Sequence, residues 1–176
     1  ELPDGITHIG QCAFYSCKKI QAINLPDSLE SMGREAFWEC HDLLSITIPE
    51  HLTRIEDSLF AYCYSLSNVK MPENIKYIGD YAFKSCKNLT FVVIPSKLTY
   101  FGWGIFSGCS SIVSVKFPEN ITEIGSSWFA SCTNLPSITI PESVKSIGNR
   151  AFSHCRSFTS ITIPSKVTRI EWNLFI

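Results

Sequence analysis

Eight cysteines are the residues of this chain with the clearest chemical potential, as nucleophiles, disulfide partners or metal ligands. Seven recur every 23 residues, at Cys17, Cys40, Cys63, Cys86, Cys109, Cys132 and Cys155. Neighbouring members would lie about 5 Å apart, which a disulfide permits, but their side chains would run parallel and seven is an odd number. Because free cysteine behaves as a small hydrophobic residue, we expect a buried column of reduced thiols. Cys12 lies outside this pattern and is expected to be exposed, either as a reactive thiol or in contact with an upstream repeat.

The histidines do not indicate a metal or catalytic site. They fall at four different positions of the 23-residue period, as His8, His41, His51 and His154. No Cys-x₂-Cys pair is present, and the spacing from Cys12 to Cys17 matches no standard zinc motif. Nucleophilic catalysis needs a base beside the nucleophile and a third group that orients the base. We therefore expect no enzyme activity, no metal and no cofactor.

A column of acidic residues follows a recurring proline, at Asp4, Asp27, Glu50, Glu73, Glu119 and Glu142. Stacked carboxylates can bind Ca²⁺, which prefers several oxygen ligands. The Asp-x-Asp spacing of such sites is missing, however, and Lys76 and Lys145 lie nearby. We interpret this column as a solvated ridge.

The composition narrows the class of protein. The chain has 176 residues, 45% of them hydrophobic and 18% charged, which is typical of one folded domain. A net charge of −1 leaves no basic field for binding nucleic acid. No segment approaches the ~20 apolar residues that a membrane span needs.

The elements that position these residues repeat with the same period. Eight prolines lie 23 residues apart, at Pro3, Pro26, Pro49, Pro72, Pro95, Pro118, Pro141 and Pro164. Eight phenylalanines do the same, at Phe14, Phe37, Phe60, Phe83, Phe106, Phe129, Phe152 and Phe175. A period held over the whole chain predicts a stack of similar units, here about seven and a half repeats forming one domain over residues 1–176.

One repeat shows the structure expected of each unit. Residues 45–48 alternate between polar and apolar, which is typical of a short strand, and Pro49 ends it. A one-faced helical spacing is found at Met32, Ala36, Phe37 and Cys40. We therefore expect an α/β solenoid with a parallel sheet on its concave side and short helical or 3₁₀ turns on its convex side.

One position of the repeat, directly after an isoleucine or its equivalent, is usually glycine: Gly10, Gly33, Gly79, Gly102, Gly125 and Gly148. Two repeats carry Glu56 and Glu171 there instead. We expect a negative φ at this position, as at the start of a helix, because a left-handed conformation would strain both glutamates.

The full repeat resembles a known family. It is clearest in residues 141–163, which carry Pro141, Val144, Ile147, Gly148, Ala151, Phe152, Cys155, Phe158, Ile161 and Ile163. This pattern is similar to the BspA-like, or treponemal-class, leucine-rich repeats, and the resemblance covers the entire chain. It implies a leucine-rich-repeat solenoid in a cell-surface or secreted protein of host-associated bacteria or mucosal protozoa. It also implies adhesion and protein binding, with host extracellular-matrix or cell-surface proteins as partners.

Two columns of strand residues should face solvent. One contains Ala22, Ser45, Asn68, Phe91, Ser114, Ser137 and Ser160, and the other Asn24, Thr47, Lys70, Val93, Lys116, Thr139 and Thr162. Phe91 and Val93 interrupt a mostly small and polar surface, and Lys70 and Lys116 flank them. With Asn68 and Ser114 they form our candidate ligand-binding site. The alternative is that the two apolar residues only favour the strand.

A second candidate is a group of aromatic residues in the middle repeats. Tyr77 and Tyr100 share one repeat position and should stack, and Tyr62, Tyr64, Tyr81 and Trp103 lie in the same repeats. Exposed aromatic residues are enriched at protein contacts, but they could also fill gaps between turns.

Two functions remain open: a non-enzymatic protein-binding module and a structural spacer that binds nothing itself. The chain begins and stops inside repeats, so we expect a fragment of a longer array. Uncapped repeats would expose apolar ends, which predicts end-to-end self-association.

Overall fold

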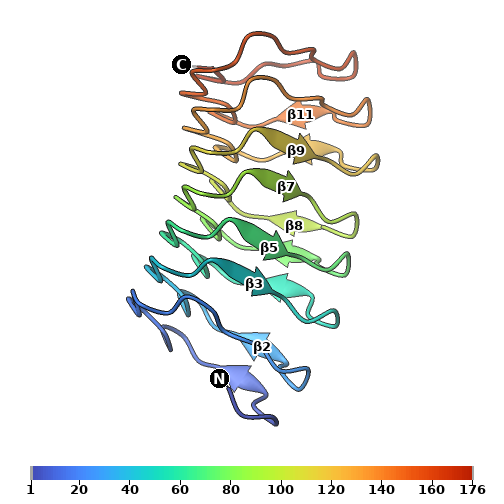
Figure 1. The fold of residues 1–176 in the computed structure, drawn as a ribbon. Helices are drawn as coiled ribbons and strands as arrows, with labels where there is room; N and C mark the ends of the chain where they lie inside the picture. The colour runs from blue at the N-terminus through green and yellow to red at the C-terminus, as the bar shows by residue number, and fades with distance from the viewer. Residues whose placement is uncertain (1, 176) are drawn as a thin grey trace.

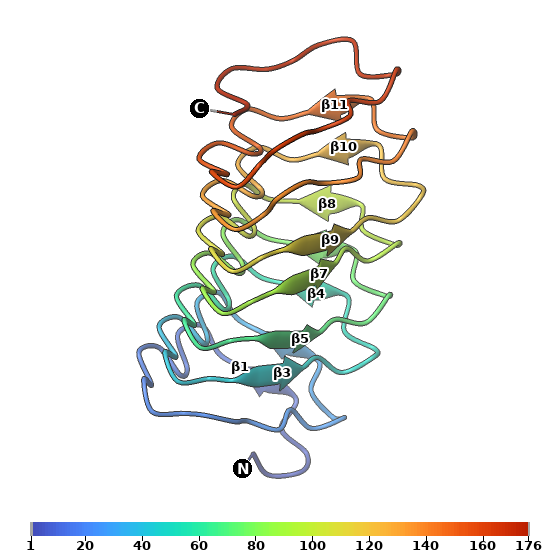
Figure 2. The ribbon, with the colours of Figure 1, turned by 45° about the horizontal axis from the view of Figure 1, so that its top comes forward.

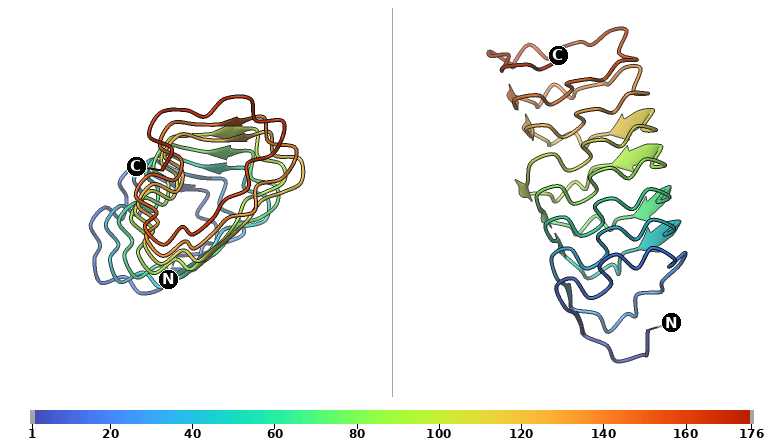
Figure 3. Two further views of the ribbon diagram at one scale, coloured as in Figure 1. Left: turned by 90° about the horizontal axis from the view of Figure 1, so that it is seen from above. Right: turned by 90° about the vertical axis from the view of Figure 1, so that its left-hand side faces the viewer.

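The computed structural model describes residues 2–175, so the first and last residues of the predicted domain lie outside it. Within this range the chain forms eleven strands of two or three residues and no helix. Figure 1 shows the coils stacked along one axis, with the two termini at opposite ends. Seen from above, each coil closes around a common interior (Figure 3). The predicted stacked repeat with parallel strands is confirmed as a parallel β-solenoid.

The strands lie on two faces of the stack. The long-strand face carries β3 (Ser45–Thr47), β5 (Asn68–Lys70), β7 (Phe91–Val93) and β9 (Ser114–Lys116). The short-strand face carries β1 (His8–Ile9), β2 (Ser31–Met32), β4 (Arg54–Ile55), β6 (Tyr77–Ile78), β8 (Tyr100–Phe101), β10 (Glu123–Ile124) and β11 (Ser146–Ile147). Every pairing is parallel and joins residues 23 apart, such as Ser45 and Asn68. The strands of the two faces run in opposite directions (Figures 1 and 2).

The predicted helical or 3₁₀ turns are wrong for the described residues. Met32 belongs to β2, and the residues that follow it form consecutive turns. Glu35 and Glu39 both have a φ of 57°, the left-handed region, which a right-handed helix cannot contain. The N–H of Phe37 donates to the carbonyl of Leu59 in the next coil (3.0 Å), whereas a helix would bond it within the segment.

The same two left-handed positions recur along the stack. The first is occupied by Cys12, Glu35, Ser58, Tyr81, Gly104, Ser127, Arg150 and Asn173. The second is occupied by Ser16, Glu39, Tyr62, Ser85, Gly108, Ser131 and His154. At the non-glycine members φ lies between 53° and 62°. These positions fold each segment into a compact turn that still directs its apolar side chains to the interior.

The interior is built on the phenylalanine column. From Phe14 to Phe175, successive rings lie 5.2 to 6.3 Å apart and within 14° of parallel. The six members from Phe37 to Phe152 are fully buried. Each coil alone would leave its ring exposed, so stacking supplies the hydrophobic cover.

The cysteines are all free, and six form a buried column from Cys40 to Cys155. Each of these thiols donates to the carbonyl of a phenylalanine 26 residues earlier, over 3.0 to 3.4 Å. The predicted buried column is thus confirmed for these six. It is wrong for Cys17, which is half-buried because no described coil covers it on its N-terminal side.

Burial disfavours ionisation of several thiols in the column. It raises the thiol pKa of Cys40 and of Cys155 to about 11, and that of Cys86 well above its ordinary value. Cys12, expected to be exposed, is half-buried, and its Sγ lies 3.4 Å from Oε2 of Glu35. Desolvation first, and then this carboxylate, raise the pKa of Cys12 as well, so its thiol is not activated.

The repeated glycine position allows two coils to approach closely. As expected, its backbone is not left-handed at Glu56. Instead, a Cβ at Gly79 would lie 2.6 Å from the backbone N of Asp57 in the preceding coil. This approach lets the N–H of Gly79 donate to the carbonyl of Ile55 (2.8 Å), and the same bond forms at Gly33, Gly102 and Gly148.

The glycine position also explains where the short-strand face is interrupted. No equivalent bond forms at Glu56 or Gly125 within residues 2–175, and β2 does not pair with β4, nor β8 with β10. Glu56 carries a side chain at the contact, and the indole of Trp128 fills the space beside Gly125. A side chain between the coils therefore holds the two strands apart.

Candidate functional site

The centre of the predicted binding site lies on β7 and β9. Phe91 pairs with Ser114, and Val93 pairs with Lys116. Phe91 is 51% exposed and Val93 37%, while Val92 between them is buried. The alternation of the strand thus turns two apolar side chains outward beside a hydroxyl and an ammonium group.

Asn68 and Lys70 lie on the adjacent β5 and are also exposed. Their strand pairs with β3 and not with β7, so the six candidate residues are divided between two separate sheets. All six nevertheless lie on the long-strand face, in successive coils (Figure 1). The predicted single continuous sheet is therefore wrong at this point, although the exposure of each residue was predicted correctly.

An open groove of about 420 Å³ adjoins Val93 and Lys116. Glu73 lines it, and the carboxylate of Glu73 accepts hydrogen bonds from the backbone N (2.9 Å) and the hydroxyl (2.7 Å) of Ser96. These bonds, with a smaller contribution from Lys116, lower the pKa of Glu73. The apolar pair is thus bordered by charges of both signs.

The predicted stacking of Tyr77 on Tyr100 is confirmed. Their rings are 4.5 Å apart and within 4° of parallel on the short-strand face. The guanidinium of Arg54 lies 3.8 Å from the centre of the Tyr77 ring, and the hydroxyl of Tyr77 donates to Asp57 (3.3 Å). Desolvation, followed by the Asp57 charge, raises the pKa of Tyr77. These contacts fix the stack as part of the scaffold.

Tyr62 and Tyr64 belong to a different set on the turns. Tyr62 packs on Trp38 at 4.8 Å, and Tyr64 stacks on His41 at 4.5 Å. Lys84 lies between Tyr62 and Tyr81, 5.6 and 4.9 Å from their ring centres. The six aromatic residues that the sequence suggested as one cluster are therefore divided: two form the stack on the short-strand face, three lie on the turns, and Trp103 lines a separate hollow.

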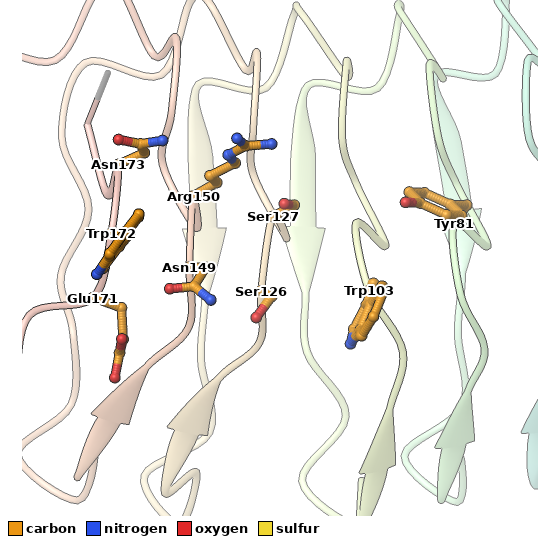
Figure 4. A pocket seen from close by; sticks show the side chains of 9 residues that line it. All are labelled: Tyr81, Trp103, Ser126, Ser127, Asn149, Arg150, Glu171, Trp172 and Asn173. Carbon is orange, nitrogen blue, oxygen red and sulfur yellow. The ribbon is translucent and has the colours of Figure 1, made fainter.

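One hollow on the turns was not revealed by the sequence. It has a volume of about 540 Å³ and is lined by Tyr81, Trp103, Ser126, Ser127, Asn149, Arg150, Glu171, Trp172 and Asn173. We call it the tryptophan groove, because Trp103 and Trp172 stand at the ends of one row of residues (Figure 4). Of these residues, the sequence suggested only Tyr81 and Trp103 as binding residues. The sequence did contain one sign of this groove, since Trp103 and Trp172 occupy the same repeat position three coils apart.

Among the described residues, neither the histidines nor the acidic residues form a cluster of potential metal ligands. Within residues 2–175, no three His, Cys, Asp or Glu side chains come together as a metal site would require. His51 instead contacts the carbonyl of Leu29 (2.6 Å), and His41 stacks on Tyr64. The described part of the chain also has no helix that could span a membrane.

Comparison with known proteins agrees with this architecture. The model of the BspA type leucine rich repeat region matches in six copies, over residues 1–113 and 76–176. A leucine-rich repeat protein of T. pallidum is 31% identical, with a TM-score of 0.82, over 88% of this chain and 72% of that protein. No curated protein matches the chain significantly.

Two further solved structures are longer than this chain. A leucine-rich cell surface protein from Faecalibacterium prausnitzii is 29% identical over 97% of this chain, with a TM-score of 0.69. A leucine-rich repeat protein from Bacteroides ovatus is 30% identical over 93% of this chain, with a TM-score of 0.73. The chain spans 54% and 48% of these two proteins, respectively.

Proposed function

The chain belongs to the BspA-type leucine-rich repeat family, and from this premise we propose that it is a non-enzymatic protein-binding module of a cell-surface or secreted protein. Its role is adhesion or host interaction, with a host extracellular-matrix or cell-surface protein as the partner. The cell surface description of the Faecalibacterium prausnitzii relative supports this location.

The observation that carries the proposal is the exposed pair Phe91 and Val93 on a regular face. Binding energy at protein interfaces concentrates in a few apolar anchors, with polar residues around them. Lys70 and Lys116 supply the charged rim, and rim charges act mainly by accelerating association. Because β7 and β9 are held in the stack, little ordering cost accompanies binding through them.

The test begins with capture of partners by the immobilised chain from host extracellular-matrix and cell-surface proteins. Affinity for the captured partner is then measured for the wild type and for Phe91→Ser. We expect the variant to bind about 30-fold more weakly, which corresponds to ~2 kcal/mol, and to unfold within ~0.5 kcal/mol of the wild type. Lys70→Ala and Lys116→Ala should slow association and reduce its salt dependence.

Leu44→Ser is the matched control, because Leu44 is 52% exposed, much like Phe91, but lies before β3. It should leave the affinity unchanged. If Phe91→Ser and the wild type bind the captured partner with equal affinity, the long-strand face is not the contact surface. Failure to capture any partner would favour the structural spacer.

A further inference from the structure

We propose that the tryptophan groove binds an oligosaccharide that carries a carboxylate, such as a chain containing a uronic or sialic acid. This site lies on the turns and is separate from the protein contact proposed for Phe91 and Val93. The argument rests on the shape of the groove, its exposed indoles, its hydrogen-bond donors and its charge.

The groove is a linear site with an aromatic ring at each end. Trp103, Ser126, Asn149 and Trp172 occupy one repeat position in four successive coils (Figure 4). Three coil spacings of ~4.8 Å place the two indoles about 14 Å apart, which suits a ligand of a few sugar units. Trp103 is 66% exposed and Trp172 80%, so their faces are open to contact. A sugar ring offers C–H groups that pack on an indole and hydroxyl groups at its rim.

The floor between the indoles is small and polar. Within residues 2–175, the side chains of Ser126, Ser127 and Asn149 form no hydrogen bond with the protein. All three line the groove, so their hydroxyl and amide groups are available to sugar hydroxyls. Ligand sites combine apolar contact with a few such polar groups that fix orientation.

The backbone of the floor offers donors but few acceptors. The carbonyls of Ser126, Asn149 and Trp172 already accept from Gly104 (2.9 Å), Ser127 (2.9 Å) and Arg150 (3.2 Å). The N–H groups of Ser126, Asn149 and Trp172 have no hydrogen-bond partner among the described residues. A peptide that adds to a sheet needs alternating donors and acceptors, so this floor favours a ligand rich in acceptors.

The neighbouring coils show which acceptor fits this row. Asp57 Oδ1 accepts from the N–H of Asp80 (3.1 Å), and Asp80 Oδ1 accepts from the N–H of Trp103 (2.8 Å). A carboxylate oxygen therefore satisfies the N–H group of this row at Asp80 and at Trp103, directly before Ser126. In the groove itself the row carries Ser126 and Asn149, so that carboxylate has to come from the ligand.

The charge of the groove also favours a ligand that carries a carboxylate. Arg150 lines it and forms no ion pair within residues 2–175. The one carboxylate in the lining, Glu171, is already paired with Arg169 (2.9 Å). An unpaired guanidinium beside free N–H groups recognises a carboxylate by charge-assisted hydrogen bonds.

The experiment uses two acidic probes and their neutral counterparts: a hyaluronan tetrasaccharide with chitotetraose, and 3′-sialyllactose with lactose. Binding is measured by calorimetry and mapped by amide chemical shifts in NMR spectra. We expect at least one acidic probe to bind at least tenfold more tightly than its neutral counterpart. Its shift changes should centre on the amides of Ser126, Asn149 and Trp172.

Variants separate this site from the rest of the surface. Trp103→Ala and Trp172→Ala should each weaken binding at least tenfold, and Arg150→Gln should abolish the preference for the acidic probe. Tyr15→Ala, at an exposed aromatic residue in the first coil, and Phe91→Ser should change nothing; melting curves check that all variants fold. Absence of binding by both acidic probes, equal binding of the neutral probes, or binding unaffected by Trp103→Ala would each overturn the proposal.

Discussion

Gly79 offers a direct test of how the coils hold together. In Gly79→Ala the new Cβ would lie 2.6 Å from the backbone N and 2.9 Å from the Cα of Asp57. Ordinary contacts begin near 3.4 Å, so the two coils must separate by almost 1 Å. The new Cβ would also meet the side-chain Oδ1 of Asp57, but because the N and Cα of Asp57 belong to the backbone, a change of side-chain rotamer alone cannot relieve the contact.

The magnitude follows from three contributions. Overpacking a close contact costs about 1–3 kcal/mol. Loss of the hydrogen bond from Gly79 to Ile55 adds about 1 kcal/mol. The lower entropy of the unfolded alanine chain offsets about 0.4–1 kcal/mol. The net loss of about 1–3.5 kcal/mol corresponds to a fall in Tm of roughly 2–14 °C for a chain of this size.

Thermal unfolding followed by circular dichroism measures this effect. Gly10→Ala is the matched control, because no atom lies within 4 Å of a Cβ at Gly10, which is in the same repeat position. The control should be neutral or slightly stabilising. If Gly79→Ala changes the free energy of unfolding by less than ~0.5 kcal/mol, or both variants lose equal stability, close approach is not the reason for glycine here.

Three further predictions concern the thiols and the ends of the stack. A thiol reagent should label only Cys12 and Cys17 in the native protein, and the six buried cysteines only after unfolding. A disulfide detected by mass spectrometry would contradict the reduced column. Because burial raises the pKa of Cys40 and Cys155 from 9.0 to about 11, the unfolded chain loses these thiol protons first. The free energy of unfolding should therefore fall between about pH 9 and 11 in urea titrations, and a rise would refute the reasoning. The 176-residue chain should self-associate through apolar residues of its end coils, such as the half-buried Phe14 and the exposed Phe175. Light scattering should therefore show a molar mass that grows with protein concentration. A constant monomer mass would contradict this prediction.

The repeat made much of the fold predictable. A strict 23-residue period placed the phenylalanine and cysteine columns in the core, and alternation identified β3, β5, β7 and β9. The strands predicted at residues 22–24, 137–139 and 160–162 were wrong, because these segments are extended without forming a strand. The helical turns were wrong because Met32, Ala36, Phe37 and Cys40 keep a helical spacing of side chains on a backbone that is not helical. The available signal was the pair Gly104 and Gly108, which mark the two left-handed positions. The short-strand face was missed because two residues are too few to show alternation.

The two candidate sites differ in how far the sequence could predict them. Exposure of Phe91 and Val93 followed from alternation along one strand. The tryptophan groove depends on backbone N–H groups whose partners are set by the side chain one coil earlier, Asp57 and Asp80 in some coils and Ser126 and Asn149 in others. Serine and asparagine are common polar residues that indicate no site in a sequence. The backbone N–H groups that they leave unpaired can be identified only from the stacked coils.

The short reach of the bonds between coils has a mechanical consequence. The thiol of Cys86, for example, bonds a carbonyl 26 residues earlier, and the carboxylate of Asp80 accepts from an N–H group 23 residues later. Within residues 2–175, each coil is thus bonded only to its immediate neighbours, so we expect tension applied to the chain termini to detach the end coils one at a time. Each detached coil of 23 residues releases about 80 Å of extended chain. A stack of this kind extends in steps under load, and the coils that remain keep their structure and their binding surfaces.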